Sequence, residues 1–326
     1  MHKWVHSPEK IRPILKELKS KGELSSAIHS VDCHGDALVH FAARAHSLEV
    51  LRIIVNECNV DVNALKRGDW TPAMIAALKG RLDVVKILEK AGANLDLCNK
   101  DGRTALHLAI QHGHVETSKY IAQRSPTSIT KATKSGRLPI QIAAALCDYG
   151  PQVSYDITTF LFDHVNDSSS SSSSNSSSGS GSSLAHRDKS GRGLLQDAAV
   201  SQNLPLVRFL LDKGADPNQT DSIGRNVIHH AAMVGHLDVL ELLFDDEQNQ
   251  TTAKSKDISH QIVAVNVDCW DVPDRWDEWT PLMHAARQGH FPIVAFLVQH
   301  ELARRNRRDK QGRTAQDIGK QRFVCV

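Results

Sequence analysis

A repeat with a period of about 33 residues constrains the fold of this chain more than any other sequence feature, because a fixed period of this length predicts a solenoid of stacked units. The segment from Gly102 to Ala109 reads Gly-Arg-Thr-Ala-Leu-His-Leu-Ala, and similar segments recur along the chain. The position of Thr104 recurs at Ala37, Thr71, Thr104, Leu138, Gly193, Asn226, Thr280 and Thr314. The successive differences in residue number are 34, 33, 34, 55, 33, 54 and 34.

The recurring residues have mechanical roles that predict two helices in each repeat. Thr71 and Thr280 can cap a helix, and the proline after each of them suits its first position. Alanine pairs let neighbouring helices approach closely, and Gly-His pairs such as Gly113-His114 turn the chain between the helices. This pattern resembles the ankyrin repeat family. The resemblance implies an all-α repeat solenoid, an array of helix-turn-helix units with hairpin fingers and a cap at each end.

The period also predicts the domain boundaries. Stripes of apolar residues between residues 8 and 30 predict two short helices that cap the N-terminal end. The predicted segments are an N-terminal cap (1–31), repeat 1 (32–65), repeat 2 (66–98), repeat 3 (99–132), repeat 4 (133–187), repeat 5 (188–220), repeat 6 (221–274), repeat 7 (275–308) and a C-terminal cap (309–326).

The two long steps predict insertions of equal length, because 55 − 34 and 54 − 33 both equal 21. In repeat 4 the second helix is expected from Asp156 to His164, followed by a flexible Ser-rich insertion at 166–184. Phosphorylation of the serines is the alternative role. In repeat 6 the insertion covers 246–274. Its polar first half is expected to be mobile, and its second half to form a long finger from Asn266 to Thr280.

Composition excludes several classes of protein. The formal net charge of +2 argues against a polyanion-binding protein, so nucleic acid is an unexpected partner. No apolar run approaches the length of a membrane span, and no signal core opens the sequence. The scattered cysteines predict neither disulfides nor a zinc site. We therefore expect a monomer in the cytoplasm. The run Arg304–Arg308 resembles a nuclear-localisation sequence, which predicts the nucleus as a second location. The alternative is that this run has only a structural role.

The sequence contains no recognisable active site. Most of its 18 histidines fall on repeat positions, which favours structural roles. No zinc-protease, nucleophile-elbow or phosphate-loop motif occurs. We expect a non-enzymatic protein with no cofactor and no metal site.

The position just before each helix cap predicts a binding surface. Ankyrin geometry implies that this residue is exposed on the concave side. Arg and Trp are enriched among interface anchors, although Arg is also common here for solubility. Together with Lys100 at a finger tip, the predicted partner-binding residues for an acidic protein surface are Trp70, Arg103, Arg137, Arg192, Arg225, Trp279 and Arg313.

Some segments resemble one member of the family, a co-regulator of alanyl-tRNA synthetase editing. They include Leu65–Pro72, Leu97–Gly102 and Asp221–Ala232. The resemblance implies binding to alanyl-tRNA synthetase and capture of misactivated serine on lysines. Lys100 matches one acceptor position, and Lys131 lies beside a second. Arg67 and Thr130 stand where the family member has lysines.

Opposite charges occupy two neighbouring predicted fingers near the C-terminus. Asp268, Asp271, Asp274, Asp277 and Glu278 precede repeat 7, and a basic run from Arg304 to Lys310 follows it. These charges are expected to meet, because neighbouring fingers stack. Trp270 and Trp276 lie among the acids and form a possible second site if they are exposed.

Overall fold

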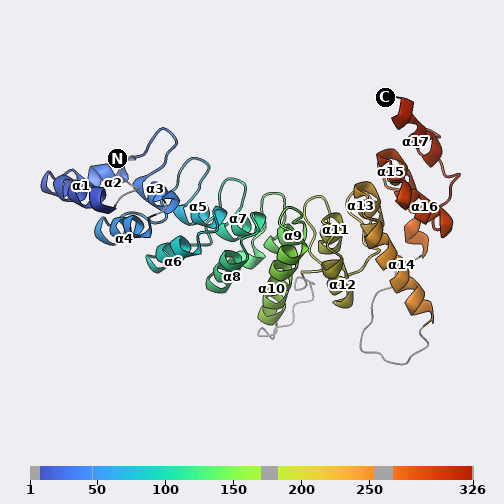
Figure 1. Cartoon of the computed structure of the whole chain (residues 1–326), viewed down its shortest axis with the longest axis horizontal. Coiled ribbons are helices and arrows are strands. Elements are labelled where there is room, and N and C mark those ends of the chain that lie inside the picture. The colour runs from blue at the N-terminus through green and yellow to red at the C-terminus, as the bar shows by residue number, and fades with distance from the viewer. Residues whose placement is uncertain (1–7, 46, 170–182, 253–266, 325–326) are drawn as a thin grey trace. The chain divides into compact units, whose positions relative to one another are not determined.

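The computed structural model describes residues 8–45, 47–169, 183–252 and 267–324 (Figure 1). Contacts divide the chain into two compact units, Met1–Ile142 and Ala143–Val326. The regular structure of the described residues is helical, apart from an isolated antiparallel bridge between Lys66 and Trp70. The prediction of an all-α repeat solenoid is confirmed.

The first unit consists of helices that alternate between the inner and outer positions of each repeat. It ends within α9, whose last two residues belong to the second unit. The helices are α1 (Pro8–Ser20), α2 (Leu24–His29), α3 (Leu38–Arg44), α4 (Leu48–Glu57), α5 (Pro72–Leu78), α6 (Leu82–Lys90), α7 (Ala105–Gln111), α8 (Val115–Arg124), the 3-10 helix η2 (Pro126–Thr130) and α9 (Pro139–Ala144).

The second unit continues the same alternation and contains the two longest helices. Its elements are α10 (Pro151–Ser169), α11 (Leu194–Val200), α12 (Leu204–Asp212), α13 (Val227–Val234), α14 (Leu237–Thr252), the 3-10 helix η3 (Val267–Trp270), α15 (Pro281–Gln288), α16 (Phe291–Gln299) and α17 (Ala315–Val324).

Small side chains allow the first helices of successive repeats to pack closely. Helix α5 lies between α3 and α7 in the first unit, and α13 and α15 lie side by side in the second. Ala42, Ala76 and Ala109 are completely buried in the first unit, as are Ala198 and Ala231 in the second. The second helices form a parallel row in each unit, for example α4, α6 and α8.

The predicted caps are present. The hydroxyl oxygen of Thr71 accepts a hydrogen bond from the N–H of Met74 at 3.2 Å. His107 Nδ1 accepts from the N–H of Thr104 at 3.1 Å, so the histidine completes a reciprocal cap. His40 also places Nε2 3.2 Å from the carbonyl oxygen of Trp70 in the next repeat. The repeated histidine therefore links two repeats as well as capping a helix.

The histidine of each Gly-His pair bridges back to the preceding repeat. His114 Nε2 lies 3.1 Å from the Leu78 carbonyl oxygen, and His290 Nε2 lies 3.2 Å from that of Met233. Gly235 packs against this second histidine with a φ of 98°. A Cβ there would lie 2.7 Å from a His290 ring carbon, so only glycine fits. The sequence predicted the turn at the Gly-His pair but not the contact of this histidine with the preceding repeat.

Backbone hydrogen bonds close each finger and join successive finger tips. The N–H of Asp221 donates to the carbonyl of Arg225, four residues on, at 2.9 Å. Between tips, the N–H of Ser222 donates to the carbonyl of Ser190 at 3.0 Å. Gly191 adopts a φ of 77°, and a Cβ there would lie 2.5 Å from the Ser222 nitrogen. Stacking of the fingers thus depends on the glycine of the tip.

The insertions depart from the predicted boundaries. Helix α10 begins at Pro151, five residues before the predicted Asp156, and runs through the first residues of the predicted flexible segment to Ser169. Helix α14 likewise extends to Thr252, past the predicted insertion start at 246. The remaining Ser-rich residues 170–182 and residues 253–266 lie outside the described residues.

The prediction of a long finger before repeat 7 is wrong for the residues that the structure describes. Residues 267–270 form η3 instead of a hairpin strand. The tip that follows is closed from the N–H of Asp274 to the carbonyl of Trp279 at 2.8 Å. This tip is one residue longer than the Asp221–Arg225 tip. The finger before repeat 7 therefore differs from the others by one residue at its tip.

Candidate protein-binding site

The finger face comprises the side chains just before each helix cap together with the finger tips beside them. The sequence predicted that these side chains are exposed. The structure shows that they are only partly exposed and that Asp36 is buried. These side chains are less exposed than predicted because they bind carboxylates and carbonyl oxygens of the same or neighbouring repeats.

In the first unit the finger face is built around Asp36 and Trp70. Asp36 pairs with Arg44 at 2.7 Å and with Lys66 at 3.4 Å. The Lys66 ammonium also lies 6.0 Å from the centre of the Trp70 ring. These contacts fix Trp70 at the side of its finger.

Further along the first unit, two arginines turn toward their own helices. A guanidinium nitrogen of Arg103 donates to Gln111 Oε1 at 2.8 Å, and one of Arg137 donates to the Gln141 carbonyl at 3.0 Å. Lys100, at a finger tip, is exposed. Lys100 is therefore free to meet a partner, whereas Arg103 is partly exposed and held by Gln111.

In the second unit, buried carboxylates hold the predicted arginines. The ion pairs are Arg192 with Asp197 at 3.1 Å, Arg225 with Asp274 at 3.1 Å, and Arg313 with Asp309 at 2.7 Å. Sequence reasoning missed the partner of each arginine. A signal was available for Asp309, because an acid recurs four residues before the arginine and its Oδ1 accepts two N–H groups of the tip.

Asp274 is the centre of the polar network in the second unit. It accepts hydrogen bonds from Arg225, from the backbone N–H of Trp279 at 3.1 Å and from His284 Nε2 at 3.1 Å. Burial opposes ionisation of this carboxyl, but these donors lower its pKa below the usual value. Burial also lowers the pKa of His284, to about 4, so its imidazole is neutral at pH 7.

Trp279 is part of the same finger and is largely committed to internal contacts. Its Nε1–H donates to Asp309 Oδ2 at 3.1 Å. The guanidinium groups of Arg313 and Arg287 lie 5.8 and 6.0 Å from its ring centre. Trp279 is thus only partly exposed, and two cations lie over its ring.

Trp276 lies at the tip of this finger and is 68 % exposed. The Lys310 ammonium donates to the carbonyl oxygens of Arg275, at 3.1 Å, and of Trp276. The Lys310 N–H donates to the Asp277 carbonyl at 3.1 Å, and Glu278 is held at a φ of 61°. The backbone beneath the exposed indole is therefore fixed on both sides.

Trp270 does not belong to the binding surface, which corrects the prediction that it forms a second site with Trp276. Its side chain is 0 % exposed. Its ring packs against Phe244 and Phe296, with centroids 6.3 and 6.4 Å away. The carbonyl of Cys269 accepts a hydrogen bond from Asn226 Nδ2 at 2.9 Å, which anchors η3 to the array.

The predicted meeting of charges between fingers is found at Asp271. Its carboxylate lies 3.1 Å from Arg307 and 3.8 Å from Arg304. Asp274, another of the acids expected to face this basic run, pairs with Arg225 of the preceding finger instead. The basic run is thus partly engaged within the unit.

The two candidate acceptor lysines differ in environment. Lys131 donates to the Asp96 carbonyl at 2.5 Å and lies 3.6 Å from the Asp96 carboxylate. Burial of Asp96 is outweighed by hydrogen bonds from Thr127 and Ser125 and by Lys131, which together lower its pKa. These contacts engage the Lys131 ammonium with Asp96 and leave the side chain only partly exposed. Lys100 is the more accessible of the two.

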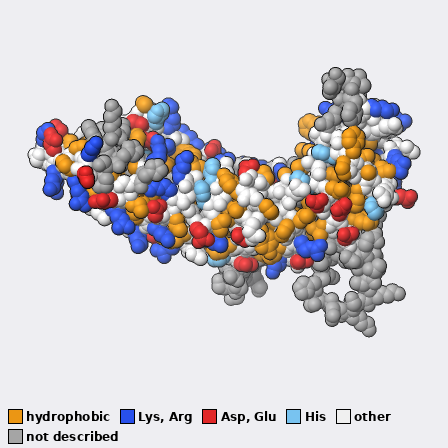
Figure 2. All heavy atoms as spheres, in the orientation of Figure 1, with side chains coloured by type: hydrophobic (Ala, Val, Ile, Leu, Met, Phe, Trp, Pro, Cys, Tyr) orange, Lys and Arg blue, Asp and Glu red, His pale blue; other side chains and the backbone are white. Residues whose placement is uncertain are grey.

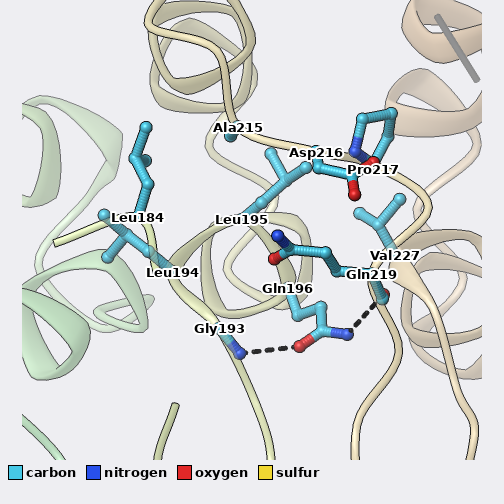
Figure 3. Close-up of a pocket in the computed structure, with 10 residues that line it drawn as sticks. All are labelled: Leu184, Gly193, Leu194, Leu195, Gln196, Ala215, Asp216, Pro217, Gln219 and Val227. Atoms are coloured by element: carbon cyan, nitrogen blue, oxygen red, sulfur yellow. Dashed lines mark hydrogen bonds between the residues drawn. The ribbon is translucent and has the colours of Figure 1, made fainter. Parts of the chain in front are cut away.

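A glutamine replaces the capping histidine in repeat 5 (Figure 3). Gln196 Oε1 accepts from the Gly193 N–H at 2.7 Å, and its Nε2 donates to the Gln219 carbonyl at 3.1 Å and to the Arg225 carbonyl at 3.1 Å. The amide therefore performs the histidine's linking role. This supports a structural interpretation of the other histidines at this position.

The described residues offer surfaces for binding. Among them, no group of three or more His, Cys, Asp or Glu side chains is arranged to hold a metal ion. The helices in the described ranges are all too short or too polar to cross a bilayer. Figure 2 shows the mixture of charged and apolar side chains that the chain presents on one face.

Comparisons with known proteins agree with this architecture. Two family models match, one described as ankyrin repeats in many copies (residues 79–122 and 195–244) and one as ankyrin repeats in 3 copies (residues 6–97 and 252–318). Together these matches cover well over half of the chain.

The curated relatives are much longer proteins. The chain is 23 % identical to ankyrin repeat protein nuc-2 of Neurospora crassa, over 72 % of this chain and 19 % of that protein. It is 27 % identical to SMC5-SMC6 complex localization factor protein 1 of Homo sapiens, over 44 % of this chain and 15 % of the relative. It is also 27 % identical to the B-cell lymphoma 3 protein homolog of Mus musculus, over 65 % and 44 %. The chain spans less than half the length of each, and what it shares with them is the repeat array. From its period, its finger and helix geometry and these matches, the chain belongs to the ankyrin repeat family.

Proposed function

We propose that the chain is a non-enzymatic scaffold that binds a partner protein on its finger face. Ankyrin repeats support a role in protein–protein interaction. The observation that carries the proposal is Trp276, a large aromatic side chain exposed on a fixed finger tip. Exposing so much apolar surface is unfavourable in water, and rigid Trp side chains are frequent interface anchors.

The finger face of the first unit supplies cations for the same kind of contact. Lys100 is exposed, and its N–H donates to the Gly68 carbonyl of the finger that carries Trp70. With the partly exposed Arg103, it suits an acidic protein surface. We place the chain in the cytoplasm or nucleus. The nuclear alternative is supported by the run Arg304–Arg308 and by a relative named for localising the SMC5-SMC6 complex.

Trp276→Ala should remove the partner while leaving the fold intact. We expect at least a tenfold loss of partner recovery in quantitative affinity purification with mass spectrometry, because interface anchors contribute on the order of 2 kcal/mol or more. Tyr149→Ala is the matched control, since Tyr149 is also exposed but lies in the loop before α10. Equal recovery by both variants would place the partner elsewhere.

A second function, co-regulation of alanyl-tRNA synthetase editing, makes a different prediction. If it holds, the synthetase forms seryl-adenylate from serine and ATP, and the amine of the exposed Lys100 attacks its carbonyl carbon, forming an amide and releasing AMP. Mass spectrometry of the intact protein and of its peptides detects the adduct, and Lys100→Arg is the control that must abolish it. Absence of the adduct in the wild-type chain would leave scaffolding as the function.

A further inference from the structure

The C-terminal end of the second unit contains an apolar cavity of about 570 Å³. One wall is a stripe on α16 formed by Phe291, Val294 and Val298, spaced three and four residues apart. Phe291 is 61 % exposed, and the two valines are partly buried. The opposite wall is α17, with Ala315 and Gly319. Figure 2 shows hydrophobic side chains gathered over α15 and α16.

The preceding repeats show what packs in this place. Helix α14 packs on α12, and α12 packs on α10, so each second helix covers the one before it. Helix α17 packs on α15 in the manner of a first helix. Among the described residues, no second helix covers the stripe on α16, and the spacing of the stripe is that of a face that packs against a helix.

Electrostatics restrict the kind of helix that fits. The charged residues that line the cavity are both cations, Arg305 and Lys320, and both are exposed. Arg305 has no ion-pair partner within the described residues, and Lys320 interacts with the Asp317 carboxylate without forming an ion pair. Arg304 and Arg307 beside them pair with Asp271. In Figure 2, Lys and Arg side chains lie next to the hydrophobic patch near α17. An occupant with acids along the edge of its apolar stripe would complement this site.

We propose that the α16–α17 cavity binds an acidic amphipathic helix of a partner protein, seated where the second helix of a further repeat would lie. This surface is separate from Trp276 and the finger tips, so it goes beyond the scaffold function proposed above. Binding in a groove through i, i+3 and i+7 anchors is an established mode of helix recognition.

The chain itself provides a probe of the required chemistry. In α14, Val239, Leu240 and Leu243 form the apolar stripe, and Asp238, Glu241 and Asp245 lie three and four residues apart beside it. A fluorescently labelled, helix-stabilised peptide of residues 237–247 should bind the full chain in a fluorescence-anisotropy titration. Asp238→Lys, Glu241→Lys and Asp245→Lys in the peptide should weaken binding at least tenfold, with the protein unchanged.

Variants of the protein locate the site. Val298→Asp should weaken binding at least tenfold, because it places a charge in the apolar stripe. Arg305→Glu with Lys320→Glu should weaken it about tenfold at low salt and less at high salt, because salt screens these charges. The matched control is Arg208→Glu with Lys213→Glu, which reverses two exposed charges on and just after α12 and should change affinity less than twofold.

Three outcomes would overturn the proposal. The acidic peptide fails to bind; it binds Val298→Asp as well as the wild type; or light scattering shows a dimer that Val298→Asp dissociates, which would make a second copy the occupant. Circular dichroism of each variant checks that the fold is retained. Trp276→Ala should bind the peptide normally, so failure here and failure of the finger-face function are distinguishable.

Discussion

Trp270→Ala should lower the free energy of unfolding of the second unit by about 3–5 kcal/mol, as expected for truncating a fully buried Trp. The indole is enclosed by Phe244 and Phe296, which belong to consecutive second helices. Its removal leaves a void that these rings fill poorly, and it also loosens η3 from α13. The effect should be largest in α14 and α16.

Urea denaturation of the variant gives the total loss of stability, and hydrogen exchange with mass spectrometry shows where protection falls. Trp276→Ala is the internal control, because this exposed Trp should change stability by less than about 0.5 kcal/mol. Equal effects of the two substitutions would show that Trp270 is not part of the core. Protection lost only in the first unit would also contradict the packing described for η3.

Acidification from pH 7 to pH 5 should destabilise the second unit more than the first. Burial lowers the pKa of His229 to about 3 and that of His284 to about 4, both in the second unit. In the first unit, burial lowers the pKa of His107 to about 4 and lowers those of His40 and His112 by less. Each imidazole binds a proton in the unfolded chain below about pH 6.5 but stays neutral in the folded chain. The stability these groups contribute is therefore complete at pH 7 and is lost as the pH falls from 6.5 toward 4.

The size of this effect follows from the pKa differences. Each histidine should lose about 2 kcal/mol between pH 7 and pH 5, at about 1.4 kcal/mol per pH unit below 6.5. Two histidines with so low a pKa lie in the second unit and one in the first. Urea titrations at a series of pH values, followed by hydrogen exchange, measure the loss in each unit.

A substitution copied from the chain itself tests the cause. His229→Gln should keep the cap, because Gln196 already accepts the cap N–H at the equivalent position. An amide does not titrate, so the variant should lose about 2 kcal/mol less than the wild type over the same pH range. An unchanged pH profile would show that another group controls acid sensitivity.

The periodic part of the structure was readable from the sequence. Thr71 with Pro72 predicts a cap and a helix start, and both are found where expected. The buried alanines follow from the same repeat, because the period assigns each alanine pair to the first helix. Local rules succeed here because the contacts of each residue are repeated at a fixed distance along the chain.

The insertions lack that period, and their contacts are not local. Trp270 looks like an exposed anchor among acids, yet Phe244 and Phe296, far from it in the sequence on either side, bury it. The finger arginines were found by position, but their carboxylate partners depend on the exact register of neighbouring repeats. Arg225 thus pairs with Asp274, 49 residues later. The insertion between them breaks the repeat period, so the pairing does not follow from the period.

The two longest helices have a consequence for how this architecture can be extended. Helix α14 has 16 residues and α12 has nine, so α14 projects about 10 Å further at about 1.5 Å per residue. Helix α10, with 19 residues, does the same on its own repeat. In Figure 1 both run away from the fingers of their unit. The ends of these helices are therefore grafting points, where a reporter or a second binding module can be spliced in without separating one finger from the next.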